Sequence, residues 1–73
     1  MLPDWATWCW RMRSGLRMTQ VEAAGVAGVS VRTWRRWEGY ESEPAEWRKD
    51  RARDAFTLEA VTAMAAPRRA GRG

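Results

Sequence analysis

The sequence lacks histidine and has one cysteine, Cys9. A lone cysteine forms no intramolecular disulfide, fits a reducing compartment and leaves no Cys/His cluster to bind zinc. There is no Gly-rich phosphate loop, and Cys9 falls in an apolar stripe, where a small core residue is more common than a nucleophile. We therefore expect no enzymatic activity, no metal and no cofactor.

Long apolar runs are also missing. No stretch of about 18 apolar residues occurs, which predicts no membrane span and no membrane partner. The N-terminus has no basic segment followed by an apolar one, so we expect no secretory signal and a cytoplasmic protein. The length of 73 residues allows one domain, which must be stabilised by bulky apolar groups or by a partner subunit.

Positive charge is abundant and comes almost entirely from arginine, since Lys49 is the single lysine and the net charge is +4. The charge is uneven, because the only acids in residues 1–37 are Asp4 and Glu22, whereas residues 38–59 are rich in acids. Arginine suits the bidentate binding of phosphate and guanine, although a GC-rich genome would also raise its frequency. The pattern favours a nucleic-acid face on the first half of the chain.

Apolar spacing and capping residues predict three helices in this first half. The first begins near Pro3, with Asp4 in its first turn, and ends near Gly15. The second follows a capping box and runs to about residue 26, and the third spans residues 31–38. Four residues mark these boundaries, namely Thr19 and Glu22 as the capping box, Gly28 as the turn and Ser30 as the next N-cap; Gly39 ends the third helix.

A fourth helix is predicted over about residues 44–64, with Ser42 as a possible N-cap and Pro44 in its first turn. Residues 65–73 contain three arginines among Gly, Ala and Pro, which predicts a disordered basic tail: Arg68, Arg69 and Arg72. The expected fold is all-α, a compact bundle of four to five helices, with one domain over residues 1–64.

The segment TQVEAAGVAGVSVRTWRRWEG, residues 19–39, resembles the Cro/repressor (XRE-type) regulators, in particular a phage-like branch. The resemblance covers about residues 13–44 and rests on a small residue, a glycine turn and apolar positions at the family's spacing: Ala24, Gly28, Ala27, Val29, Trp34 and Trp37. Two departures are the direct Glu38–Gly39 step and the bulk of Trp34. The resemblance implies a lambda-repressor-like fold with a helix-turn-helix at residues 20–39.

The resemblance also implies a DNA-binding surface. Base-reading positions fall on Val31, Arg32 and Arg36, and Gln20 falls where the family contacts phosphate and often a base. The full predicted set is Arg17, Thr19, Gln20, Ser30, Val31, Arg32, Thr33, Arg35 and Arg36. Arg35 is alternatively a solvated charge and Gln20 a simple first-turn residue, whereas Trp34 and Trp37 are expected in the core. The family further implies a structural ion pair between Arg13 and Glu38.

Together these features predict a sequence-specific transcriptional regulator of double-stranded DNA. The expected form is a dimeric repressor or autoregulator of a phage or mobile-element operon, nucleoid-associated in a bacterial host. We expect a homodimer on a palindromic operator, joined through the fourth helix or the Trp-rich first helix. The alternative is a protein-binding module, such as an antitoxin, an inhibitor or an anti-CRISPR-type phage factor, which the surplus tryptophans favour: Trp8, Trp10 and Trp47.

Overall fold

The computed structural model describes residues 4–65, and its ordered elements are four helices. They are α1 (Trp5–Gly15), α2 (Gln20–Ala27), α3 (Val31–Glu38) and α4 (Glu46–Ala65). No strand occurs in this part of the chain, so the predicted all-α class is confirmed for it. The predicted basic tail starts at residue 65, which belongs to α4, and otherwise lies outside the described residues.

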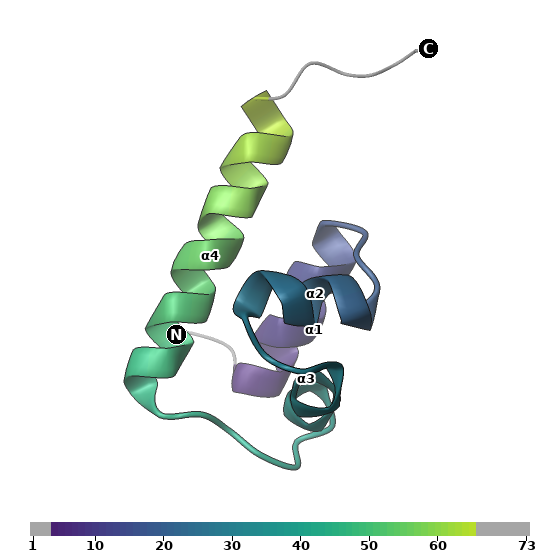
Figure 1. The fold of residues 1–73 in the computed structure, drawn as a ribbon, viewed down its shortest axis with the longest axis vertical. Helices are drawn as coiled ribbons and strands as arrows, with labels where there is room; N and C mark the ends of the chain where they lie inside the picture. Colours follow the sequence, from purple (N-terminus) through teal and green to yellow (C-terminus); the bar gives the residue numbers. More distant parts are fainter. Residues whose placement is uncertain (1–3, 66–73) are drawn as a thin grey trace.

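The first three helices form a cluster, and α4 runs along one side of it (Figure 1). Helix α2 packs against both α3 and α4, and α1 packs against α3. The last turns of α4 extend beyond the other helices (Figure 1). Within residues 4–65 no helix combines the length and the apolar character needed to cross a membrane.

Aromatic side chains fill most of the core. Trp34 and Phe56 are fully buried with ring centroids 5.5 Å apart, and Trp37 contacts Trp5 edge to face at 5.3 Å. Trp8 stacks on Trp5 at 4.7 Å and covers the cluster from outside. Aromatic pairs in such geometries add stability beyond the area that they bury. A chain this short therefore obtains a continuous core from a few large rings.

Small residues complete the core. Ala23 and Ala24 on α2 are buried, as is Ala52 on α4, and their size allows neighbouring helices to approach closely. Cys9 is also fully buried. Burial, and then the nearby charge of Glu38, raises the pKa of the Cys9 thiol. The thiol therefore stays protonated and behaves as a small apolar side chain.

Polar side chains cap the N-termini of the first three helices. The predicted capping box is present, with Thr19 Oγ1 accepting from the Glu22 amide at 3.1 Å and Glu22 accepting from the Thr19 amide at 2.8 Å. Ser30 caps α3 as predicted, accepting from the Thr33 amide at 3.1 Å. The placement of Asp4 inside the first turn of α1 was wrong. Asp4 is the N-cap and accepts from the Thr7 amide at 2.9 Å, because its backbone is extended.

The first three helices end with a residue in the left-handed region. Gly28 has φ +75° after α2, as the predicted turn requires, but the corresponding residues after α1 and α3 are Arg17 at +56° and Tyr40 at +62°. Gly39 follows α3 directly with φ −90°, so it ends the helix as predicted without being the left-handed residue. Backbone hydrogen bonds spanning five residues close each turn, as in the Schellman motif.

The predicted start of α4 was wrong by two residues. The helix begins at Glu46, after Ala45, whose carbonyl accepts from the amides of the third and fourth residues that follow it. Glu43 lies before the helix, and its carboxylate pairs with Lys49 Nζ. Glu46 also pairs with Lys49 at 3.1 Å, and hydrogen bonds from these two carboxylates raise the pKa of Lys49. This acid–lysine cluster joins the loop before α4 to the helix, and Pro44 lies outside the helix.

Candidate nucleic-acid interface

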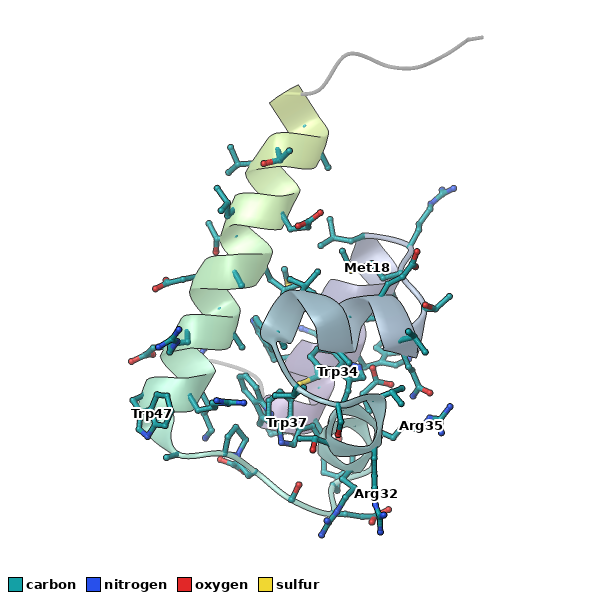
Figure 2. All side chains as sticks on the ribbon, in the orientation of Figure 1. Met18, Arg32, Trp34, Arg35, Trp37 and Trp47 are labelled. Atoms are coloured by element: carbon teal, nitrogen blue, oxygen red, sulfur yellow. The ribbon has the colours of Figure 1, made fainter. Side chains whose placement is uncertain are left out.

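Helix α3 has two faces of opposite character. Trp34 and Trp37 are buried on one face, whereas Arg32, Arg35 and Arg36 are exposed on the other. Figure 2 shows Arg32 and Arg35 pointing away from the helix cluster, while Trp34 and Trp37 lie within it. The spacing of three between the tryptophans places both on one side of a helix. The aromatic anchors thus determine which way the arginines face.

A buried carboxylate at the end of α3 fixes the helix relative to α1. Arg13 Nε donates to Glu38 Oε2 at 2.6 Å and Arg13 Nη2 donates to Oε1 at 3.1 Å, so the ion pair expected from the family resemblance is present and bidentate. The Glu38 side chain is only 9% exposed. Trp34 Nε1 donates to the same carboxylate. Arg13 also donates to the Met18 carbonyl at 3.3 Å, which secures the loop after α1.

These contacts set the charge of Glu38. Burial by itself raises the pKa of a carboxyl group, but the hydrogen bonds from Arg13, Trp34 and Gln20 outweigh burial and lower the pKa of Glu38 below its usual value. The group therefore stays ionised at neutral pH. A charged Glu38 is the acceptor on which three helices converge.

Gln20 connects this buried centre to the exposed arginines. Its Nε2 donates to Glu38 Oε1 at 3.2 Å, and its Oε1 accepts from Arg35 Nε at 3.1 Å. The relay holds the guanidinium of Arg35 against the start of α2. Gln20 is thus more than a simple first-turn residue, and Arg35 is more than a freely solvated charge.

The other residues of the predicted DNA-binding set lie at the N-terminal ends of α2 and α3 or close to them. Ser30 is exposed, and its Oγ also contacts Thr33 Oγ1 at 3.1 Å. Arg17 and Thr19 are exposed beside the start of α2. Val31 was expected on the outward face, but it is half-buried and packs against the core. Among the predicted residues, the hydrogen bond between Gln20 and Arg35 joins the start of α2 to the exposed face of α3, and Val31 is turned partly inward.

Two polar contacts at this site were not predicted from the sequence. The first is the Trp34–Glu38 hydrogen bond. The two residues are four positions apart in one helix, and this spacing could have predicted their contact. The second is Glu41, whose Oε1 lies 3.9 Å from Arg36 Nε in an exposed pair. Exposed pairs of this kind contribute little stability, so Arg36 can exchange Glu41 for another anion.

The arrangement presents three exposed arginines on α3, one of which is held against the start of α2, and this combination suits phosphate and base edges. Among the described residues, no group of three or more Cys, Asp or Glu side chains is placed to hold a metal ion. Comparison of the chain with family models, curated proteins and solved structures found no match. Function is therefore inferred from the geometry of α2 and α3.

Proposed function

We propose that the protein is a sequence-specific regulator that binds double-stranded DNA through a helix-turn-helix formed by α2 and α3. The observation that carries the proposal is the polarity of α3, in which buried Trp34 and Trp37 orient the exposed Arg32, Arg35 and Arg36 outward. The three-residue connection after α2 begins with Gly28 in a left-handed conformation, as such a turn requires. Helix α3 would lie in the major groove.

In this proposal the arginines of α3 and the start of α2 have different roles. Arg32 and Arg36 read base edges, because arginine binds guanine in a bidentate manner that is worth about 1–3 kcal/mol of discrimination. The start of α2, with Thr19 and its exposed neighbour Arg17, positions the protein on phosphates. Arg35, held by Gln20, lies between the two groups. The expected target therefore contains guanine.

The proposed biological role is repression or autoregulation of a phage or mobile-element operon, with the protein on the host nucleoid. A homodimer on a two-fold symmetric operator stays a prediction from the sequence. The half-sites of such an operator would be about 34 Å apart.

The test is selection of binding sites from a random pool of double-stranded DNA. Wild type is compared with an Arg32→Ala, Arg36→Ala double variant, and the control is Arg11→Ala, which removes an exposed charge from α1. We expect wild type and the control to enrich the same guanine-containing site and the double variant to lose it. Enrichment of that site by the double variant would contradict the role given to α3.

A protein-binding module, such as an antitoxin or an inhibitor, is the second proposal. It is favoured by the exposure of Trp10 and Trp47, at 54% and 59%, because tryptophan is enriched at interface hot spots. If wild type enriches no DNA sequence, this proposal replaces the first. A pull-down from host lysate with Trp10→Ala as the control would then identify the partner.

A further inference from the structure

Helix α4 has a row of exposed residues on the side that faces away from the core, in addition to its buried side. Its core-facing residues Lys49, Ala52 and Phe56 are buried at spacings of three and four. Five exposed residues follow one another at alternating spacings of four and three along the opposite side, and we call them the outer stripe: Trp47, Arg51, Asp54, Leu58 and Val61. This is the spacing that keeps one side of a helix against a second helix.

The outer stripe is apolar at both ends and charged in the middle. Trp47 is 59% exposed, Leu58 69% and Val61 56%, so the stripe leaves a large apolar area in water. Between them, Arg51 and Asp54 are exposed and take part in no ion pair among residues 4–65. Their neighbours Arg53 and Asp50 do pair, at 3.1 Å. The central charges of the stripe are therefore available to a partner.

We infer that the outer stripe is the interface through which two copies of this chain associate, with their α4 helices antiparallel. An antiparallel alignment that places Trp47 opposite Leu58 of the second copy also places Arg51 opposite Asp54 of the second copy. Two-fold symmetry repeats both contacts, giving two Trp–Leu contacts and two ion pairs. The stripe is thus complementary to itself in charge and in apolar character.

A parallel alignment lacks this complementarity. It would place Arg51 against Arg51 and Asp54 against Asp54, and like charges facing each other in an interface oppose association. In the antiparallel alignment the two helices overlap over residues 46–59, so the contact uses the N-terminal part of α4 and Val61 lies beyond the overlap. The order of charges along the stripe therefore selects the orientation of the two helices.

The position of the stripe suits the proposed function without depending on it. In Figure 2, Trp47 points to the side of the molecule opposite Arg35. A second copy beyond Trp47, with α4 antiparallel, is related to the first by a two-fold axis along the viewing direction. The α3 arginines, of which Figure 2 shows Arg35 pointing to the right and Arg32 to the bottom, then stay uncovered in both copies.

The first test measures self-association of the full chain without DNA, by sedimentation equilibrium from micromolar to millimolar concentration. We expect a monomer–dimer equilibrium for wild type. Leu58→Arg should abolish the dimer, and the control Val21→Arg, at an exposed aliphatic residue of α2, should not. Trp10→Arg tests the competing surface on α1. A monomer at every concentration, or a dimer lost with Trp10→Arg and kept with Leu58→Arg, would overturn the inference.

Charge exchange tests the orientation. Arg51→Asp alone and Asp54→Arg alone should each weaken dimerisation by about tenfold or more, because each creates facing like charges. The Arg51→Asp, Asp54→Arg double variant should restore it, since the reciprocal pairs are rebuilt with their signs reversed. Circular dichroism checks that all three variants keep their helix content. If the double variant dimerises no better than the single variants, the antiparallel pairing is contradicted.

Disulfide trapping gives an independent check of orientation, because the native Cys9 is fully buried. Under mild oxidation, a mixture of Trp47→Cys and Leu58→Cys chains should form the mixed disulfide. A Leu58→Cys protein that efficiently cross-links to itself would instead show parallel helices and overturn the inference. None of the three experiments contains DNA, so their outcomes are separate from that of the binding-site selection.

Discussion

Glu38 is the residue on which the arrangement of α1, α2 and α3 depends, since its carboxylate accepts from Arg13, Gln20 and Trp34. Three donors from three helices compensate for the burial of one charge. Removing any donor leaves that charge less satisfied, while the surrounding side chains cannot easily move. The orientation of the α3 arginines thus depends on a contact that does not itself reach the surface.

At the residue scale, Arg13→Ala should lower the free energy of unfolding by about 3–5 kcal/mol, because it leaves Glu38 buried without its cation. Arg11→Ala on the same helix is the control, and its exposed side chain predicts a change within about 0.5 kcal/mol. Urea unfolding monitored by circular dichroism measures both. Equal stability of the two variants would show that the ion pair contributes nothing.

Glu38 should also make stability depend on pH. The pKa of Glu38 in the folded protein is lowered from the usual value of 4.5, so its contribution is fully present above that pH and is lost as pH falls below it. The difference in unfolding free energy between wild type and Glu38→Gln should therefore be largest at neutral pH and shrink in acid. Urea titrations over this range measure the difference, and a constant difference would contradict the lowered pKa.

At the element scale, the turn between α2 and α3 depends on backbone conformation rather than space. A Cβ added at Gly28 would meet no atom within 4 Å, yet φ of +75° is unfavourable for any residue with a Cβ. Gly28→Ala should therefore lower the free energy of unfolding by about 1–2 kcal/mol. Thermal and urea unfolding measure this cost.

Gly25 provides the matched control for the turn. It lies inside α2, and an added Cβ there also meets no atom within 4 Å. Gly25→Ala should stabilise the protein by about 0.5–1 kcal/mol, because alanine favours the helix and has fewer unfolded conformations. We expect Gly28→Ala to lower the free energy of unfolding and Gly25→Ala to raise it. A loss of stability in both variants would indicate crowding around α2.

At the scale of the whole molecule, charge is divided between two regions of the chain. Residues 1–37 contain six arginines and two acids, whereas residues 38–59 contain seven acids and four bases. If the basic part binds DNA through roughly six to ten phosphates, affinity should fall about a thousandfold or more between roughly 50 and 200 mM salt. Fluorescence anisotropy with the selected site measures this slope. An affinity that is insensitive to salt would argue against DNA as the ligand.

Local sequence patterns predict the features that act over three or four residues. The caps at Thr19 and Ser30, the turn at Gly28 and the inward spacing of Trp34 and Trp37 all involve near neighbours, so the local pattern predicts them. The predicted start of α4 was wrong because Ser42 and Pro44 are typical of a helix start, whereas the residue before a proline disfavours the helical conformation and the helix begins only at Glu46. The predicted pair of Arg13 and Glu38 came from the family resemblance and not from spacing.

Which side chains meet across the helices follows from the packing of the helices and not from local sequence. Gln20 turns out to join Glu38 to Arg35, Val31 packs partly inward, and the outer stripe from Trp47 to Val61 is the side of α4 that no other described helix covers. The residues joined in this way are 15 and 18 positions apart in the network around Gln20. Such contacts depend on how the helices cross, because helix periodicity determines which residues share a face but not what that face will meet.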